Sequence, residues 1–314
     1  MCRFFFARLP IDSLTFKHIM LADSHIHFIP SELSEYTSFY KGIWTNKDKL
    51  YQFLDNNNID RAFLVYPSTD AHLKLGGLKR VSEIYNREVE KILKENPKII
   101  ATCLVDVGDL NNISRELAEL KSKGFRAINL ASSYDGKFIV EELFPLFEAA
   151  QEHNLPIFVH AQTINPIGYS RVKDPLLMPV LEYSLDLSTF LGLLMMQGVL
   201  DKFRIKFILA SLGGVVPFLK DRFDRVYTML REREMVKDLG RLPSEVLKEV
   251  YVDTSGASLG NIKLALDLFG PDHILWGSDY PVNLDLKSNL KILDELGKEA
   301  KEKITYKNLV GLFE

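Results

Sequence analysis

Short apolar runs alternate with longer stretches of helical period from residue 21 to the end of the chain. Runs such as AFLV at 62–65 are continuously apolar, which is typical of parallel strands that are covered on both faces. The longer stretches have the period of helices that could supply this cover. Repetition of the unit predicts a parallel α/β fold. The eight expected strands are 21–27, 61–66, 99–105, 126–130, 156–160, 205–210, 249–253 and 273–277, with helices at 81–96, 113–122, 140–154, 188–202, 215–233 and 258–269.

Eight strands with intervening helices predict one (β/α)₈ TIM barrel, which occupies residues 20–314. Residues 1–19 are expected to be an N-terminal extension or a start-site artefact, because Met20 stands directly before the first strand. This segment is a poor signal peptide, since its apolar run is interrupted and no small-residue cleavage site follows.

Composition narrows the functional classes. Hydrophobic residues make up 46% and charged residues 26% of the chain, as in ordinary globular proteins, and the net charge is −3. The interspersed charges give no general attraction to nucleic acid or to an anionic membrane, which favours a small-molecule substrate. Only two cysteines are present, far apart, so a disulfide framework is not expected and a cytoplasmic location is predicted.

Candidate metal ligands stand at the ends of three expected strands. His25 and His27 are two residues apart, so a strand directs both imidazoles to the same side. His160 ends the fifth strand, and Asp279 follows the eighth. Taken alone, the histidine pair is better explained as solvent-exposed or hydrogen-bonded side chains, and Asp279 equally well as a helix cap or turn residue. Their shared place at the catalytic edge of a barrel favours a metal site.

Three neutral imidazoles and one carboxylate form the nitrogen and oxygen set that zinc and some other divalent metals prefer. Four ligands of this kind leave a position open for water or substrate, which indicates a catalytic site rather than a structural one. We therefore expect one divalent metal ion, with zinc as its first candidate.

Further motifs accompany these candidate ligands along the chain. They are DSHIH at 23–27, FVH at 158–160, GG at 213–214, WGSDYP at 276–281 and NL at 308–309. With these motifs the chain resembles the amidohydrolase-related (amidohydrolase 2) family, and the stretch 198–222 resembles its aminocarboxymuconate-semialdehyde decarboxylases; other members are hydrolases, lactonases or hydratases. The resemblance implies a TIM barrel of the metal-dependent hydrolase type, with a mononuclear metal held by His25, His27, His160 and Asp279.

Four positions qualify this resemblance. Ser211 stands where relatives carry a histidine that activates metal-bound water, and the stretch 28–59 lacks the arginine that clamps the decarboxylase substrate. His72 could replace the missing histidine on the same face, or it could be an ordinary solvated loop residue. Arg222 matches a family arginine that enters the site of a neighbouring subunit, which predicts a homodimer; a helix-surface arginine is the equal alternative.

These residues support three functions. The preferred one is a hydrolase in which Asp279 deprotonates a metal-bound water and Ser211 orients it toward an ester, lactone or amide carbonyl. The second is a non-oxidative decarboxylase, favoured by Arg222 and disfavoured by the missing histidine. The third is a non-catalytic barrel that keeps the metal for binding or stability.

Overall fold

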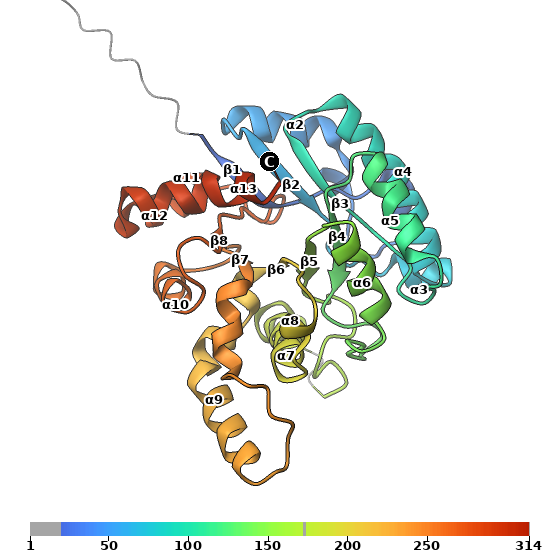
Figure 1. Cartoon of the computed structure of the whole chain (residues 1–314). Helices are drawn as coiled ribbons and strands as arrows, with labels where there is room; N and C mark the ends of the chain where they lie inside the picture. The colour runs from blue at the N-terminus through green and yellow to red at the C-terminus, as the bar shows by residue number, and fades with distance from the viewer. Residues whose placement is uncertain (1–19, 172–173, 314) are drawn as a thin grey trace, which may run out of the picture.

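The computed structural model describes residues 20–171 and 174–313, which form a barrel of eight parallel strands in chain order (Figure 1). The predicted extension at 1–19 lies outside the described residues. Each expected strand is present, although several are shorter than the apolar run that predicted them. The strands are β1 (Ala22–His27), β2 (Arg61–Val65), β3 (Ile99–Cys103), β4 (Ala127–Ala131), β5 (Ile157–His160), β6 (Phe207–Leu209), β7 (Tyr251–Asp253) and β8 (Ile274–Leu275).

Backbone hydrogen bonds join the first strand to the segment after the last one. Ser24 N–H donates to the carbonyl of Trp276 at 2.8 Å, and His27 N–H donates to the carbonyl of Tyr280 at 2.9 Å. The N–H of Asp279 donates in the other direction, to the carbonyl of His25 at 2.9 Å. The predicted (β/α)₈ barrel is therefore confirmed, and its two ends meet beside the candidate ligands.

Helices surround the strands (Figure 1). The α-helices are α1 (Ser31–Ser34), α2 (Lys47–Asn56), α3 (Ala71–Leu75), α4 (Leu78–Glu95), α5 (Ile113–Ser122), α6 (Phe144–Glu152), α7 (Tyr183–Met196), α8 (Val199–Lys202), α9 (Val216–Glu232), α10 (Leu259–Phe269), α11 (Leu286–Ile292), α12 (Lys298–Glu302) and α13 (Asn308–Phe313). Tighter or wider turns connect them, as 3-10 segments η1 (Gly42–Thr45), η3 (Ser211–Gly213), η4 (Pro243–Glu249) and η5 (Leu293–Leu296), and as π segments η2 (Met178–Glu182) and η6 (Lys303–Lys307).

Two predicted helices differ from the observed ones. The single helix expected at 188–202 is divided into α7 and α8, because Gly198 adopts a left-handed backbone with φ of +66°. The helix expected to begin at 140 begins at Phe144, where Pro145 lies in the first turn. Proline suits that position because the first turn needs no N–H donor.

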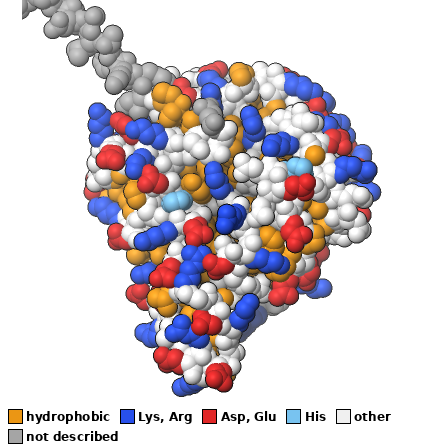
Figure 2. All heavy atoms as spheres, viewed as in Figure 1, with side chains coloured by type: hydrophobic (Ala, Val, Ile, Leu, Met, Phe, Trp, Pro, Cys, Tyr) orange, Lys and Arg blue, Asp and Glu red, His pale blue; other side chains and the backbone are white. Residues whose placement is uncertain are grey.

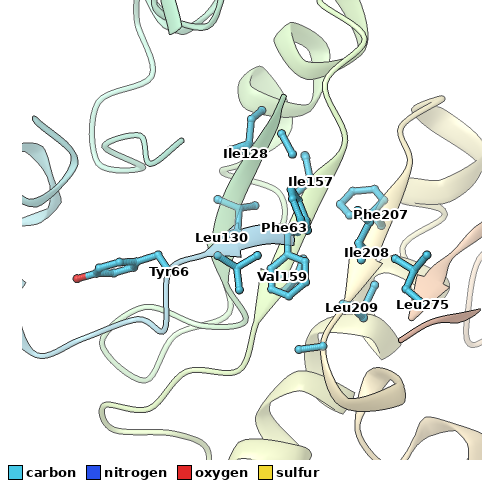
Figure 3. Packing of buried hydrophobic residues seen from close by; sticks show 14 of the residues in the cluster. Phe63, Tyr66, Ile128, Leu130, Ile157, Val159, Phe207, Ile208, Leu209 and Leu275 are labelled. Atoms are coloured by element: carbon cyan, nitrogen blue, oxygen red, sulfur yellow. The ribbon is translucent and has the colours of Figure 1, made fainter. Parts of the chain in front are cut away.

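The apolar interior ends directly beneath the candidate ligands. Phe158 of β5 contacts Phe63 of β2, with ring centroids 5.7 Å apart, and also the imidazole of His25 at 5.4 Å. Outside the barrel, Phe147 of α6 packs on Phe207 of β6 with centroids 5.5 Å apart. Figure 3 shows how side chains of neighbouring strands fill this core. A dry, closely packed floor therefore supports the site.

The outer surface carries both charges. On the face shown in Figure 2, Lys and Arg side chains are intermingled with Asp and Glu. Within residues 20–171 and 174–313, no helix has the length and apolar character that a bilayer span requires.

Gly277 provides a test of the packing where the barrel closes. An added Cβ would lie 2.8 Å from the Cβ of His25 and 3.3 Å from the Oγ of Ser24. We expect Gly277→Ala to lower the free energy of unfolding by about 1–3 kcal/mol, the usual cost of overpacking. Urea unfolding of the metal-free protein measures this. Gly311→Ala is the matched control: its Cβ would meet nothing within 4 Å in α13, so it should stabilise by about 0.5–1 kcal/mol. Equal shifts for both variants would contradict the packing argument.

Candidate metal centre

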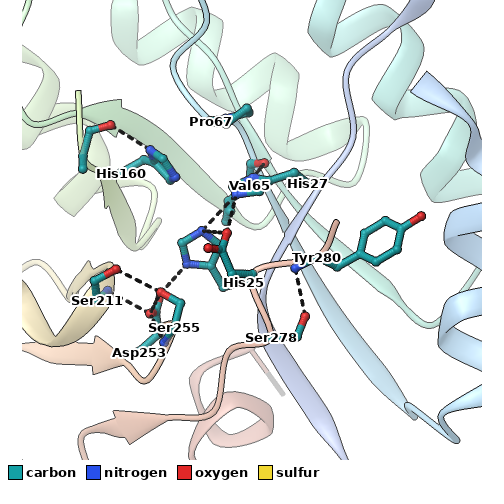
Figure 4. A network of polar contacts seen from close by, with 12 residues as sticks. His25, His27, Val65, Pro67, His160, Ser211, Asp253, Ser255, Ser278 and Tyr280 are labelled. Carbon is teal, nitrogen blue, oxygen red and sulfur yellow. Dashed lines mark hydrogen bonds and ion pairs between the residues drawn. The ribbon is translucent and has the colours of Figure 1, made fainter. Parts of the chain in front are cut away.

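Three histidines meet at the carboxyl end of the barrel (Figure 4), and the carboxylate of Asp279 lies beside two of them. His25 and His27 leave the same side of β1, and their Nε2 atoms lie 3.1 Å apart. His160 ends β5, and one ring nitrogen from each histidine lies within 4.8 Å of the others. Oδ1 of Asp279 is 3.2 Å from Nε2 of His27 and 3.7 Å from Nε2 of His25. The structure therefore brings the four sequence-predicted ligands into one small space.

Hydrogen bonds fix the rings of two of these histidines. Nδ1 of His27 lies 2.9 Å from the carbonyl oxygen of Val65, and Nδ1 of His160 lies 2.8 Å from that of Ala161. Because a carbonyl oxygen only accepts, each Nδ1 must carry the proton, and each neutral ring keeps its lone pair on Nε2. Two lone pairs and the Asp279 carboxylate then face the same space. This donor set fits a divalent cation.

Asp253, at the end of β7, holds the third ring. Its Oδ2 accepts from Nδ1 of His25 at 2.7 Å, while Oδ1 accepts from the N–H of Ser211 at 2.9 Å and the hydroxyl of Ser255 at 2.6 Å. A carboxylate behind a metal-binding histidine orients the ring and increases its basicity. The sequence-based candidates do not include Asp253, although its place at the end of a strand, like that of His160, was an available indication.

Burial and charge give the histidines different pKa values. Burial lowers the pKa of His160 to about 3 and also lowers that of His27. Burial opposes protonation of His25 as well, but the Asp253 carboxylate outweighs it and raises the pKa of His25 to about 9. Burial acts to raise the pKa of Asp279, yet its bond to His27 and the charge of His25 lower it overall. Near neutral pH His25 is therefore the one histidine of this centre that is protonated on both ring nitrogens in the metal-free protein.

Ser211 begins a left-handed turn above the centre. Residues 211–214 have φ values of +47°, +57°, +71° and +71°. This turn places the Ser211 hydroxyl 3.1 Å from that of Ser255, while its N–H donates to Asp253. Ser211 thus lines the site and is tied to the carboxylate that supports His25.

A cavity of about 1060 Å³ opens over these residues. Segments that follow β1, β2, β5, β6, β7 and β8 contribute to its walls, together with η2, α7, α9 and α10. Trp44 stacks on His27 at the inner end, with ring centroids 5.6 Å apart and planes inclined by 26°. The candidate ligands therefore have access to a space large enough for a small-molecule substrate.

His72 and Arg222, also predicted as site residues, lie outside this cavity. Nδ1 of His72 donates to the carbonyl of Thr69 at 3.0 Å, and its Nε2 lies 3.5 Å from Oδ1 of Asp135. It lines a second cavity of about 310 Å³. Arg222 is exposed on α9, one turn beyond Phe218, and is not among the described residues that line the larger cavity.

Comparison with known proteins identifies relatives of this chain. The family model described as "Amidohydrolase" matches residues 22–309. A curated relative, the 2-amino-3-carboxymuconate-6-semialdehyde decarboxylase of Dictyostelium discoideum, is 22% identical over 243 residues. This match covers 74% of the chain but 64% of the relative, so the chain spans less than two thirds of that protein's length.

Solved structures share the fold at low identity. A 5-carboxyvanillate decarboxylase from Novosphingobium aromaticivorans, complexed with manganese and 4-hydroxy-3-methoxy-5-nitrobenzoic acid, superposes with a TM-score of 0.81. It is 20% identical, and the alignment covers 94% of this chain and 96% of that one. A 2,6-dihydroxybenzoate decarboxylase from Rhizobium has a TM-score of 0.77 at 19% identity, covering 94% and 98% of the two chains.

These comparisons correct the predicted reaction. The curated relative and both solved enzymes are decarboxylases, so the expected hydrolase, and with it the assignment of the enzyme to the hydrolases, is wrong. The absence of a water-activating histidine at Ser211 argues against a decarboxylase only if water is a reactant. Removal of carbon dioxide consumes no water and needs no base to activate one. The carboxy-lyase alternative therefore fits better.

The raised pKa of His25 predicts pH-dependent metal binding. Below about pH 9 the ion must displace the His25 proton, whereas His27 and His160, whose pKa values are lowered, offer no competing proton. Metal affinity should therefore fall about tenfold for each unit that the pH falls from 9 to 7. Titration of the metal-free protein with zinc against a competing chelator measures this. A constant affinity over this range would show that His25 is already neutral.

Asp253→Asn tests the carboxylate behind His25. The amide keeps the shape of the side chain but loses the charge, so the dissociation constant for zinc should rise about 10–100-fold. Asp224→Asn is the control, because this carboxylate accepts from the N–H and hydroxyl of Ser244 at 2.9 and 2.6 Å, outside the metal-binding network. Unchanged zinc affinity in Asp253→Asn would mean that backbone packing alone orients His25.

Proposed function

The chain belongs to the amidohydrolase family, and from this premise we propose that it is a metal-dependent carboxy-lyase, which releases carbon dioxide from a small carboxylic acid. The observation that carries the proposal is the convergence of His25, His27, His160 and Asp279 in a chain whose curated relative is a decarboxylase. Because the chain spans less than two thirds of that relative's length, the carboxy-lyase activity of the whole protein is itself part of the proposal.

His25, His27, His160 and Asp279 would hold the metal ion. When bound there, a divalent ion neutralises the substrate anion and stabilises the charge that develops as carbon dioxide leaves. One structural neighbour contains manganese, and a set of three imidazoles and a carboxylate suits manganese as well as zinc. A divalent ion is thus supported, while zinc itself stays a prediction.

The residues around the ligands have separate tasks in this reaction. Cleavage of the bond to the carboxylate leaves an electron pair on carbon, and that carbon must gain a proton as neutral carbon dioxide departs. We assign this proton transfer to Asp279, whose side chain is 29% exposed to the cavity, unlike the buried His25 and His27. Its lowered pKa keeps it ionised near neutral pH, so it would first accept a proton from the solvent or from the substrate and then pass that proton to the carbon. Trp44, stacked on His27, keeps bulk water from that side of the centre.

Ser211 would position the substrate. Its hydroxyl lines the cavity beside that of Ser255, which donates its own hydrogen to Asp253, so the Ser211 hydroxyl can donate to a hydroxyl or carbonyl oxygen next to the scissile carboxylate. His72 lines the other cavity and has no part in this scheme. A homodimer that uses Arg222, and a cytoplasmic location, remain predictions; the exposure of Arg222 on α9 is compatible with contact to a second copy.

Carbon dioxide release tests the proposal. Protein reconstituted with manganese or zinc should decarboxylate members of a panel of 2-hydroxybenzoic and enoic acids, followed by a coupled carbon dioxide assay. His160→Ala should lose bound metal and more than about 100-fold of this activity, because one ligand of an open site is removed. His153→Ala is the control, since that ring bonds to the Ser114 hydroxyl at 3.0 Å beyond α6 and should not affect either property.

Other outcomes would decide against a carboxy-lyase. Turnover of esters, lactones or amides without carbon dioxide release would contradict it. Full metal content with no turnover of any panel member would favour a barrel that only binds the ion. Full metal occupancy in His160→Ala would show that the ligand set itself is misassigned.

A further inference from the structure

At the inner end of the large cavity, a bound divalent ion would leave little unbalanced positive charge to attract a substrate anion. The Asp279 and Asp253 carboxylates together balance a divalent ion bound at the histidines, because an imidazole that binds an ion through its lone pair is neutral. One substrate anion can still coordinate the ion directly. A second anion on the same molecule would need a cation elsewhere in the cavity.

Within a single chain, the described walls supply no such cation. Among the described residues that line the cavity there is neither lysine nor arginine, and Arg222 is exposed outside them. The wall instead carries another acid, Asp70, whose Oδ2 accepts from the N–H and the hydroxyl of Ser38 at 3.0 and 2.6 Å. A dianionic substrate would therefore meet repulsion along the way to the metal ligands.

The outer end of the cavity is apolar on several sides. Phe39, after β1, is 70% exposed, and Phe218, at the start of α9, is 83% exposed. Single exposed apolar side chains are common on protein surfaces, but a group of them around one cavity indicates a binding surface. The same mouth is lined by Met178 and Val180 of η2, Leu264 of α10 and Val282 after β8.

The size of the cavity agrees with a ligand that reaches this mouth. At about 1060 Å³ it lies at the upper end of the range of small-molecule sites, roughly 300–1,000 Å³. A single-ring acid held at His25, His27 and Asp279 would leave the outer part empty. An apolar extension of that acid would instead cover the exposed side chains of Phe218 and Val180.

We propose that the substrate is a monoanionic acid with a bulky alkyl or aryl group, whose anion lies at the metal ligands and whose apolar group lies against Phe39, Val180, Phe218 and Leu264. This inference rests on the proposed function for the place of the anion. It adds the chemical class of the rest of the molecule.

Binding of unreactive analogues tests this without turnover. The probes are 2-nitrophenol, its 4-hexyl derivative and 4-hydroxy-3-nitrobenzenesulfonate, none of which has a carboxylate to lose; the sulfonate adds an anion that is a poor metal ligand. Calorimetry with the manganese-loaded protein should find the hexyl compound at least about tenfold tighter than 2-nitrophenol, because two buried methylenes suffice for that gain. The sulfonate should bind at least about tenfold more weakly than 2-nitrophenol.

Variants locate the apolar contact. Phe218→Ala combined with Val180→Ala should reduce the hexyl gain to less than about threefold and leave 2-nitrophenol affinity unchanged, because only the outer wall is altered. Leu73→Ala combined with Met235→Ala is the control: both side chains are exposed, neither lines the cavity, and the hexyl gain should persist.

Three results would overturn the inference. The first is a sulfonate affinity equal to that of the hexyl compound. The second is a full hexyl gain in the Phe218 and Val180 variant. The third is a change in the oligomeric mass of that variant, measured by light scattering, without any change in ligand affinity. The last would mean that a second copy covers the mouth. Failure of the proposed function is distinguishable: hexyl-selective binding without carbon dioxide release from any acid would overturn the carboxy-lyase and leave the binding inference standing.

Discussion

The hydrogen bond from the N–H of Asp279 to the carbonyl of His25 connects residues that are far apart along the chain, and the metal centre depends on it. Together with the bonds from Ser24 and His27 to the segment after β8, it closes the sheet so that the first strand lies beside the last. Only a closed barrel can place the ends of β1, β5, β7 and β8 around one point. The chemistry is therefore a result of closure, and packing at Gly277 protects it, because no Cβ fits between that backbone and His25.

Within this frame, hydrogen bonds to the far side of each ring determine what the near side can do. Backbone carbonyls hold His27 and His160 in one tautomer, whereas the carboxylate of Asp253 holds His25 and makes it the one protonated member of the metal-free site. The proton thus takes the place that the ion would occupy. The same carboxylate also reduces the positive charge of the centre, which links metal binding to the kind of substrate that the cavity accepts.

Much of this could be predicted from the sequence, because the edge of a parallel barrel converts strand ends into neighbours. The eight strands and the meeting of His25, His27, His160 and Asp279 follow from that rule. Asp253 could not be assigned in the same way, since its role depends on the orientation of a ring on another strand. His72 follows β2 but lines a second cavity, because of the conformation of its loop. Hydrophobic periodicity does not encode loop conformation. The reaction was mispredicted because one ligand set supports both water attack and decarboxylation, and Ser211 alone cannot distinguish them.

The left-handed turn at 211–214 also limits how the site can vary. At position 211, asparagine, aspartate, histidine and glycine tolerate a positive φ, whereas valine or isoleucine would be strained. At position 214 even fewer residue types fit, because a Cβ there would lie 2.3 Å from both the carbonyl oxygen of Ser184 and the hydroxyl oxygen of Ser188. A directed-evolution library aimed at new chemistry on this barrel would therefore find usable diversity at 211 and almost none three residues later. The backbone conformation of this turn therefore limits which side chains can occur next to the metal ligands, before any catalytic requirement applies.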